Sequence, residues 1–270
     1  MRRIKLQVPA ARLHDAYDIL LAHLPAGVHA TVSDDDVELV ALGEQGELPP
    51  IGEVRAWIAH LASGPVVEED AGPDLAHALA AAMPRHEIAG RIAVRNPLQP
   101  APPAGWIDVV LERGAGFGTG SHPTTRHCLE LLLSIEPRGA FADLGCGAGA
   151  LTIAAAKLGF APVVGVDLLA DATATAARNA VANDAAIDFV TADLQTLTQL
   201  EVRTAVVNVS ETNVHEHLAG VPAPDLRNLV VSGLEDPNQL ATALIGYARA
   251  GLHEETRIDA LRWPAVLLRR

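Results

Sequence analysis

Short apolar runs alternate with longer segments of helical periodicity from Trp106 to the end of the chain. The runs that we expect to form strands cover residues 141–144, 163–167, 187–190, 204–208 and 228–232. Strands that alternate with helices are typical of a parallel sheet with helices on both faces. Two further runs, 257–261 and 265–268, flank Trp263-Pro264 and predict a closing hairpin. We therefore expect a doubly wound, mostly parallel seven-stranded α/β domain over residues 106–270.

The first part of the chain has a different pattern of apolar and polar residues. Residues 3–8 alternate as a strand does, and residues 10–24 carry apolar side chains at helical spacing. The expected elements that follow are a hairpin, a second helix and a short strand, at residues 28–32 with 37–42, 51–61 and 65–67. The order βαββαβ predicts a smaller ferredoxin-like α+β domain over residues 1–68. Domains of this kind often bind another macromolecule, although the fold alone proves no role.

A connecting region separates these two patterns, at residues 69–105. It contains one Ala-rich stretch that predicts a helix over 75–83 and one apolar stretch that predicts a strand over 88–94. Four prolines follow within a few residues of one another, at Pro97, Pro100, Pro102 and Pro103. Because proline restricts the backbone, we expect this region to act as a stiff linker.

Composition and charge limit the cellular compartments and the kinds of partner that we expect. The chain is 49% hydrophobic, and its two cysteines, Cys128 and Cys146, favour a reducing compartment over a disulfide framework. No apolar run approaches the roughly 18 residues of a membrane span, and the basic start Met1-Arg2-Arg3-Ile4 lacks the apolar core of a signal peptide. We expect a cytoplasmic protein without membrane contact. The net charge of −13 disfavours direct nucleic-acid binding and suits a basic protein partner, or simply high solubility.

The stretch Asp143-Leu-Gly-Cys-Gly-Ala-Gly149 carries the strongest chemical signal. It follows an apolar run and opens an Ala-rich one, so it predicts a glycine turn between a strand and a helix. Gly145, Gly147 and Gly149 would let the backbone approach a ligand closely, and the helix N-terminus attracts an anionic group. Asp167, which ends the next apolar run, is placed to accept hydrogen bonds from ribose hydroxyls. The sequence therefore predicts a nucleoside-containing cofactor.

Several cofactors fit a glycine turn, and Asp143 favours one of them. The spacing also satisfies a dinucleotide fingerprint for a nicotinamide or flavin cofactor, and a glycine turn without any ligand is the structural alternative. A carboxylate two residues before the first glycine would repel a pyrophosphate. The same carboxylate suits S-adenosylmethionine, which carries an ammonium group and a cationic sulfur. We expect S-adenosylmethionine, with no bound metal, since the sequence contains no metal-binding or nucleophile motif.

Three other places carry candidate site residues. The glycine-rich loop 114–125 predicts a flap over a ligand, with Phe117 placed where core packing does not need it. Asn208 ends an apolar run, so its amide carbonyl would line the crevice at the strand ends and orient a substrate amine. Asp193 follows another expected strand and would meet the adenine, or else cap a turn. His215 and His217 diverge on a helix, so we interpret them as solvated side chains.

Two of these stretches, Gly116-Phe-Gly-Thr-Gly-Ser-His-Pro-Thr-Thr125 and Asp143 to Gly149, are similar to those of the PrmA-type methyltransferases. That family uses S-adenosylmethionine to methylate amino groups of protein eleven of the large ribosomal subunit, and its order of domains matches nearly the full chain. The resemblance implies cofactor contacts from Thr125, Gly145, Asp167 and Asn208. It also implies that the loop 117–125, including Phe117 and Thr119, covers the cofactor.

The resemblance implies direct methyl transfer to a neutral lysine or N-terminal amine, aligned by Asn208 and shielded from water. Two alternatives stay open. A methyltransferase of the same fold can act on a small molecule, and a catalytically silent protein can bind the cofactor and dock on a partner. The second alternative arises because Asn208 is followed by the polar run Ser210-Glu211-Thr212-Asn213, where the family has more apolar residues.

Overall fold

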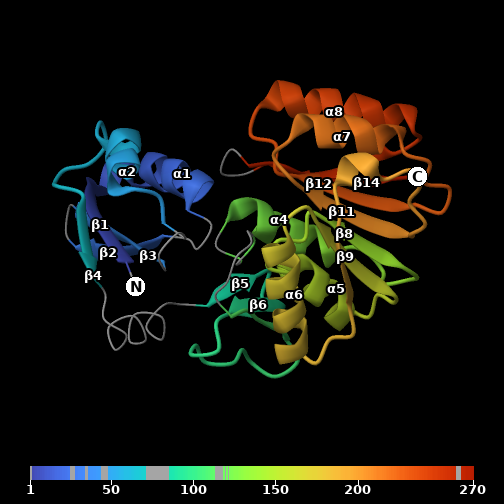
Figure 1. Ribbon diagram of the computed structural model, residues 1–270, viewed down its shortest axis with the longest axis horizontal. Helices are drawn as coiled ribbons and strands as arrows, with labels where there is room; N and C mark the ends of the chain where they lie inside the picture. Colours follow the sequence, from blue (N-terminus) through green and yellow to red (C-terminus); the bar gives the residue numbers. More distant parts are fainter. Residues whose placement is uncertain are drawn as a thin grey trace. The chain divides into compact units, whose positions relative to one another are not determined.

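The structure is a computed structural model, and it describes residues 2–24, 28–33, 36–43, 48–70, 85–112, 118, 120, 122–259 and 263–270. The chain divides into two compact units (Figure 1). One unit comprises Met1–Arg85 with Asn96–Pro100, and the other comprises His86–Arg95 with Ala101–Arg270. The domain boundaries expected after residues 68 and 105 stay predictions about where independent folding units begin and end.

The N-terminal unit has the expected βαββαβ order. Its elements are β1 (Arg2–Pro9), α1 (Leu13–His23), β2 (His29–Ser33), β3 (Asp36–Gly43), α2 (Ile51–Ile58) and β4 (Val67–Asp70). The strands lie in the order β2-β3-β1-β4, and every neighbouring pair is antiparallel. This arrangement confirms the ferredoxin-like prediction. A 3-10 helix, Ala10–Arg12, precedes α1, so the α-helix begins later than the apolar spacing suggested.

Alternation along β1 explains how this small unit is built. Ile4, Leu6 and Val8 are buried, and they pack in one cluster with apolar residues of α1 and α2. The intervening residues face the other side of the sheet, where Arg3 and Lys5 form ion pairs with Glu69 at 3.5 and 2.6 Å. One face of the sheet is therefore apolar and covered by helices, and the other is polar.

The expected single strand over 88–94 is wrong, because a tight turn divides it. β5 (His86–Ile88) and β6 (Ile92–Arg95) form an antiparallel pair, and β7 (Ile107–Val110) adds a parallel strand that the sequence did not predict. Ala89 and Gly90 make the turn with φ of 49° and 63°, values that an alanine rarely adopts. The helix expected over 75–83 lies outside the described residues.

The larger unit contains the expected seven-stranded sheet. Its strands are β8 (Phe141–Leu144), β9 (Val163–Asp167), β10 (Asp188–Thr191), β11 (Thr204–Asn208), β12 (Asn228–Ser232), β13 (His253–Ile258) and β14 (Ala265–Arg269). They lie in the order β10-β9-β8-β11-β12-β14-β13. The first five are parallel to one another, and β14 is antiparallel to both β12 and β13. The doubly wound prediction is confirmed, although β13 begins four residues earlier than expected.

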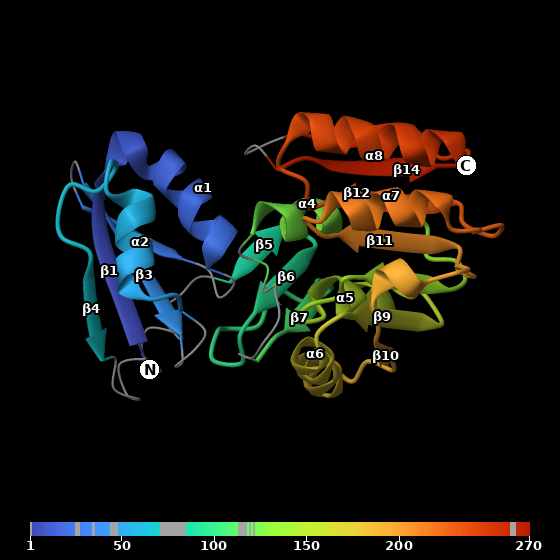
Figure 2. The same cartoon turned by 45° about the horizontal axis from the view of Figure 1, so that its top comes forward.

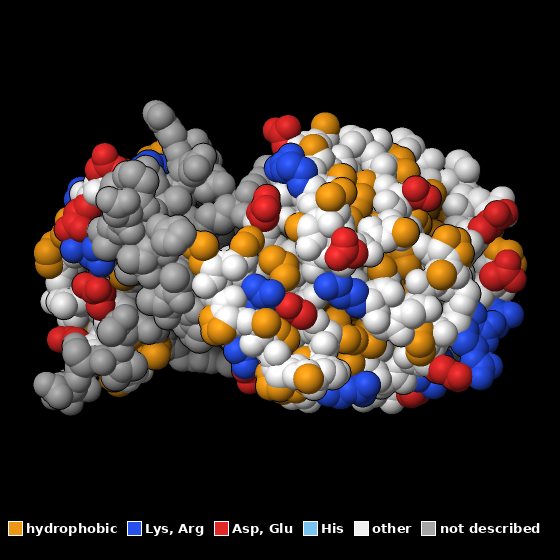
Figure 3. Space-filling view, turned by 90° about the horizontal axis from the view of Figure 1, so that it is seen from below, with side chains coloured by type: hydrophobic (Ala, Val, Ile, Leu, Met, Phe, Trp, Pro, Cys, Tyr) orange, Lys and Arg blue, Asp and Glu red, His pale blue; other side chains and the backbone are white. Residues whose placement is uncertain are grey.

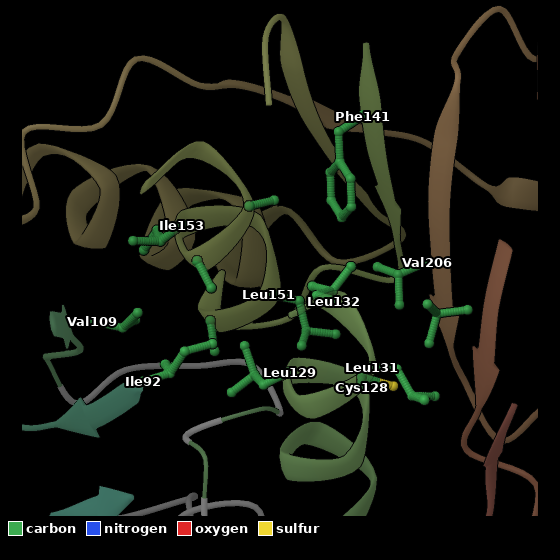
Figure 4. Packing of buried hydrophobic residues seen from close by; sticks show 14 of the residues in the cluster. Ile92, Val109, Cys128, Leu129, Leu131, Leu132, Phe141, Leu151, Ile153 and Val206 are labelled. Atoms are coloured by element: carbon green, nitrogen blue, oxygen red, sulfur yellow. The ribbon is translucent and has the colours of Figure 1, made fainter. Parts of the chain in front are cut away.

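Helices cover both faces of this sheet (Figure 2). One side carries α4 (Pro123–Leu132), α5 (Ala150–Leu158) and α6 (Ala170–Ala182), and the other carries α7 (Thr212–Gly220) with α8 (Pro237–Arg249). Strand alternation sends Phe141 and Val206 into the cluster with α4 and α5, which Figure 4 shows. Their neighbours Leu144 and Val207 pack in the cluster with α7 and α8. Among the described residues, no helix is long and apolar enough to cross a membrane.

The strand order places a crevice at the end of β8. From β8 the chain continues to β9 and β10 on one side, and later to β11 and β12 on the other side. Helices before and after such a reversal cover opposite faces, so the loops at the carboxyl ends of β8 and β11 diverge and leave room for a ligand. The glycine turn follows β8 directly, and Asn208 ends β11.

Candidate functional site

The glycine turn after β8 has the conformation that its sequence predicts. Gly145, Gly147 and Gly149 all adopt left-handed φ values, of 96°, 52° and 89°. Two features exclude a side chain at Gly145: its left-handed backbone, and the overlap that a Cβ there would have with Val209 Cγ1. The backbone N–H groups of Gly145 and Cys146 donate to the Val166 carbonyl at 2.8 and 2.9 Å, which ties the turn to β9. The turn is therefore wedged between the ends of β9 and β11.

Asn179 of α6 supports the far end of this turn, and the sequence analysis missed it. Its side-chain amide donates to the Ala148 carbonyl at 2.9 Å, while its carbonyl accepts from the Glu112 N–H at 2.9 Å. The side chain is completely buried. A lone amide within the buried stripe of an Ala-rich helix was the available signal, because a buried amide requires partners.

Asp167 lies at the end of β9, as expected, and both of its carboxylate oxygens already accept hydrogen bonds. Oδ2 accepts from the Gly147 N–H at 2.8 Å, and Oδ1 accepts from the Leu169 N–H at 3.0 Å. The structure thus brings Asp167 and the glycine turn together. Each oxygen has a second lone pair, so the carboxylate retains the capacity to accept from ribose hydroxyls.

Asp193 follows β10 next to Asp167, since the Ala192 N–H donates to the Asp167 backbone carbonyl at 2.9 Å. Its side chain is exposed and accepts from the Gln195 N–H at 2.9 Å, which caps the 3-10 helix Leu194–Thr196. This is the turn-capping role that the sequence left open. A contact with adenine stays a prediction.

Asp143 is the most unusual carboxyl group of the site. It is completely buried, and its Oδ2 accepts a 2.5 Å hydrogen bond from the Thr152 hydroxyl of α5. Its Oδ1 is buried without any hydrogen-bond partner in the described part of the chain. Burial raises the pKa of Asp143 to about 7, because a carboxylate loses its hydration inside the protein. Thr152 was missed because its role depends on which side of α5 meets β8.

Two further side chains on the α4 side of the sheet have buried polar atoms with no partner in the described part of the chain. They are Thr125, through Oγ1, and Asn208, through Oδ1; neither atom has a partner among the described residues. Asp143 and Asn208 follow Phe141 and Val206 by two residues each, so strand alternation turns them to the α4 side of the sheet. Thr125 lies in the first turn of α4, which packs beside β11 and β12. We call these three atoms the open cluster.

The open cluster fits a polar, cationic ligand group. Buried polar atoms are normally hydrogen-bonded, and an unpaired one costs about 1–3 kcal/mol. Asp143 Oδ1 and Asn208 Oδ1 can only accept while the carboxyl is ionised, so the group that satisfies them must donate. An ammonium donates three hydrogen bonds, and its positive charge supplies the counter-charge that a buried carboxylate requires. The observed residues therefore suit the amino-acid end of S-adenosylmethionine better than a pyrophosphate.

Of the predicted flap, the structure describes only part. Phe117 and Thr119 lie outside the described residues. Gly120 packs so tightly on Val94 that a Cβ there would lie 2.8 Å from Val94 Cβ. His122 caps α4, because its Nδ1 accepts from the Thr124 N–H at 3.3 Å. Burial lowers the pKa of His122 to about 4, so this cap stays neutral and able to accept.

The interpretation of His215 and His217 as solvated side chains is wrong. His215 is completely buried between α7 and α8, where its ring contacts the Tyr247 hydroxyl and the Val209 carbonyl. His217 is half-buried and lies 2.9 Å from the Leu197 carbonyl through Nε2. Both rings point toward carbonyl groups that sequence spacing alone could not reveal. Within the described residues, no group of three or more His, Cys, Asp or Glu side chains could hold a metal ion.

Comparisons with known proteins agree with this geometry. The sequence model of the family "Ribosomal protein L11 methyltransferase (PrmA)" matches residues 76–221, which is more than half of the chain. A "Ribosomal protein L11 methyltransferase" of Geobacter metallireducens is 40% identical over 108 residues, covering 40% of this chain and 36% of the relative. One of Aliivibrio fischeri is 38% identical over 136 residues, covering 50% of this chain and 44% of the relative. The matches thus span less than half the length of these curated relatives.

A solved structure supports the fold over a longer stretch. The ribosomal protein L11 methylase of Lactobacillus delbrueckii subsp. bulgaricus superposes with a TM-score of 0.61 at 22% sequence identity. The superposition covers 70% of this chain and 99% of that one. At this identity the likeness speaks for the fold alone.

Proposed function

The chain belongs to the PrmA family, and from this premise we propose that it transfers methyl groups from S-adenosylmethionine to amino groups of a protein. The family match covers the glycine turn, Asp167 and Asn208, which together form a continuous set of contacts at the carboxyl ends of β8, β9 and β11. The observation that carries the proposal is the open cluster. Buried polar atoms that have no partner in the described part of the chain, beside a glycine turn, suit a cationic nucleoside cofactor and disfavour a dinucleotide.

Each part of the site has a distinct role in holding this cofactor. Asp167 would accept from the ribose hydroxyls, and the glycine turn would let the backbone approach the ligand. Asp143 Oδ1 would accept from the ammonium of the amino-acid end, which would satisfy its unpaired oxygen. When bound, S-adenosylmethionine supplies a methyl group activated by a cationic sulfur. The flap residues Phe117 and Thr119 are proposed to cover the cofactor and exclude water.

Asn208 is proposed to orient the methyl-accepting amine. Its side-chain carbonyl is buried and has no partner among the residues that the structure describes, so it can accept from one N–H of a neutral amine and direct the nitrogen lone pair. A lysine amine has an ordinary pKa of about 10.4, and transfer from water into a closed site lowers that value. The site therefore needs alignment and desolvation, and it does not need a strong base.

The substrate class is proposed from the family and the charge. The relatives are named for ribosomal protein L11, and we propose a ribosomal large-subunit protein as the substrate here. A net charge of −13 would attract a basic protein. On the face shown in Figure 3, acidic and basic side chains of the larger unit are intermixed, so attraction there would be local. The polar face of the N-terminal sheet, with its Arg3, Lys5 and Glu69 ion pairs, is a candidate for substrate selection.

Methyl transfer to purified, unmethylated ribosomal protein L11 tests this function directly. The protein is incubated with methyl-labelled S-adenosylmethionine and L11, and the modified residues are located by mass spectrometry. We expect label on lysine or N-terminal amines. Label that enters only small molecules of a cell extract would instead support the small-molecule alternative, and cofactor binding without any transfer would support the silent alternative.

A shortened chain separates cofactor binding from substrate selection. We expect a fragment that begins at His86, the start of the larger unit, to bind S-adenosylmethionine as the full chain does. The same fragment should transfer methyl groups to L11 much more slowly, because it lacks the proposed recognition unit. Transfer at the normal rate by a folded fragment would show that residues 1–85 do not select the substrate.

A further inference from the structure

A buried pair of side chains on α7 and α8 reaches the residue after Asn208. His215 Nε2 lies 3.0 Å from the Val209 carbonyl oxygen, and His215 Nδ1 lies 3.2 Å from the Tyr247 hydroxyl. His215 is completely buried, and Tyr247 is 2% exposed. The two rings meet edge to face, with centroids 6.3 Å apart. The pair thus links the α7–α8 layer to the segment that leaves β11.

The chemistry of the three partners determines the tautomer of His215. A carbonyl oxygen only accepts, so Nε2 must carry the proton and donate to Val209. Nδ1 is then a bare acceptor, and the Tyr247 hydroxyl donates to it. Burial lowers the pKa of His215, which keeps the ring neutral and preserves this arrangement. The result is a directed chain of two hydrogen bonds that ends on the Val209 peptide.

Val209 is also held from its other sides. Its backbone packs on Gly233, where a Cβ would lie 2.6 Å from both its N and its C atoms, and Gly233 has a φ of 95°. Its side chain fills the space beside Gly145. The Val209 carbonyl lies in the peptide plane between Val209 and Ser210, so the orientation of this plane helps to fix the path of the chain directly after Asn208. His215 supplies the hydrogen bond from side chain to backbone that fixes that plane.

We propose that His215 is a positioning residue, which holds the Val209 carbonyl so that the chain after Asn208 keeps the path that presents the Asn208 side-chain carbonyl to the site. This inference rests on the proposed function insofar as it assigns Asn208 to the substrate amine. This role accounts for the buried hydrogen bond between His215 and Tyr247, which lies between two helices that otherwise pack through apolar side chains. It also gives a role to a residue that the cofactor site itself does not use.

Two substitutions separate hydrogen bonding from packing. His215→Gln places an amide N–H near the position of Nε2 and can still donate to Val209. His215→Asn is too short to reach Val209 but retains a polar group near Tyr247. His217→Asn is the matched control, because His217 occupies the same helix and reaches Leu197 instead. Thermal unfolding of each full-length variant measures its stability separately from its activity.

The first readout does not depend on catalysis. Nitrogen NMR of the wild-type protein should show His215 protonated on Nε2 and bare on Nδ1. The side-chain amide signal of Asn208 should shift in His215→Asn and stay close to its wild-type position in His215→Gln and His217→Asn. A proton on Nδ1 in place of Nε2 would overturn the proposal, and so would an unchanged Asn208 signal in His215→Asn.

The second readout is single-turnover methyl transfer to ribosomal protein L11. We expect His215→Asn to slow transfer roughly tenfold or more, with the Kd for S-adenosylmethionine changed less than about threefold, while His215→Gln stays near the wild-type rate. Equal rates in the Gln and Asn variants would overturn the positioning role. If the wild-type protein itself transfers no methyl group, the proposed function fails, and the NMR comparison still decides the role of His215.

Discussion

The two sides of the candidate site differ in how completely their polar groups are paired. On the β9 side, Asp167 accepts from two backbone N–H groups, and the glycine turn is tied to β9 by two more hydrogen bonds. On the β11 side, the open cluster of Thr125, Asp143 and Asn208 ends in buried atoms that have no partner among the described residues. Hydrogen bonds within the protein thus hold the first side in place, whereas the second offers acceptors to a ligand under the proposed function.

Under the proposed function, this difference separates the part that holds the cofactor ribose from the part that meets the reacting groups. A sugar needs a rigid carboxylate in a fixed position, and backbone hydrogen bonds supply that rigidity to Asp167. A reacting amine and a charged cofactor end need acceptors that nothing else occupies. Unpaired buried groups destabilise the protein by about 1–3 kcal/mol each, and such strain is characteristic of functional sites.

The largest effect is expected at Asn208. If its carbonyl orients the amine, its loss should harm the transition state more than the ground state. Asn208→Ala should lower the rate of methyl transfer ten- to a thousandfold, about 1.4–4 kcal/mol, as measured by single-turnover kinetics at saturating cofactor and L11. Some loss of S-adenosylmethionine affinity is compatible with this role. A near-normal transfer rate would remove Asn208 from the mechanism.

Asp143 should give the next largest effect, and a pH dependence. Its pKa is raised to about 7, and the ionised form is needed to accept from an ammonium. The affinity for S-adenosylmethionine should therefore rise about tenfold per pH unit up to pH ~7 and fall again above about pH 8, where the amino group of the cofactor loses its proton. Asp143→Asn should weaken binding at pH 8 by about 3 kcal/mol and abolish this pH dependence. Isothermal titration calorimetry at several pH values measures both; a flat wild-type profile would contradict the assignment.

The same carboxyl group should affect the stability of the unliganded protein. Because folding raises the pKa of Asp143 from 3.8 to about 7, its contribution is present below pH 3.8 and is lost as the pH rises toward 7. Asn cannot ionise, so Asp143→Asn avoids this loss. Urea unfolding should show the free energy of unfolding of the variant, relative to wild type, increasing between pH 5 and 7 by about 1.4 kcal/mol per unit. A pH-independent difference would argue against a buried, titrating carboxyl.

On the paired side, Asp167→Ala should weaken S-adenosylmethionine binding by about 1.5–3 kcal/mol, through loss of charge-assisted hydrogen bonds to ribose. Because Asp167 also accepts from the Gly147 N–H, thermal unfolding must show that the variant is folded. Asp167→Asn is the matched control, since it keeps an acceptor oxygen and loses the charge. An unchanged Kd in a folded Ala variant would reject the ribose assignment.

Asp193 should give the smallest effect. Its side chain is exposed and already caps a 3-10 helix, so a contact with adenine would be partly solvated. Asp193→Ala should weaken cofactor binding by about 1 kcal/mol or less, and Asp193→Ser, which can still cap, should separate the two roles. If Ser restores wild-type affinity, the cap matters more than the carboxylate. A loss as large as that of Asp167→Ala would show that Asp193 belongs to the cofactor site.

The sequence predicted the strands that end at the site and the polar residues at their ends on both sides. β8, β9 and β11 have the expected bounds, because each is a short apolar run that ends at a clear break: glycine follows β8, and β9 and β11 end in Asp167 and Asn208. The turn at Gly145 could be predicted from the local sequence, since the positive φ that it needs favours glycine. The turn at Ala89 could not, because an alanine gives no signal for a left-handed conformation.

The supporting side chains could not be predicted in the same way. The partner of Thr152 lies 9 residues away in the chain. The two partners of Asn179 lie 31 and 67 residues away, and those of His215 lie 6 and 32 residues away. Which face of each helix meets the sheet decides these pairs, and an Ala-rich helix has a weak amphipathic pattern. Their buried hydrogen bonds are therefore a product of tertiary packing, and only the structure reveals them.

Calorimetry with S-adenosylmethionine and with NAD at pH 8 decides whether the open cluster receives a cationic cofactor. We expect measurable heat and a saturable isotherm for S-adenosylmethionine, no binding of NAD, and a strongly weakened isotherm for Asp143→Asn. These results would show that the open cluster receives a cationic cofactor. Binding of NAD without binding of S-adenosylmethionine would contradict the account, because the buried Asp143 carboxylate would then lie beside a pyrophosphate.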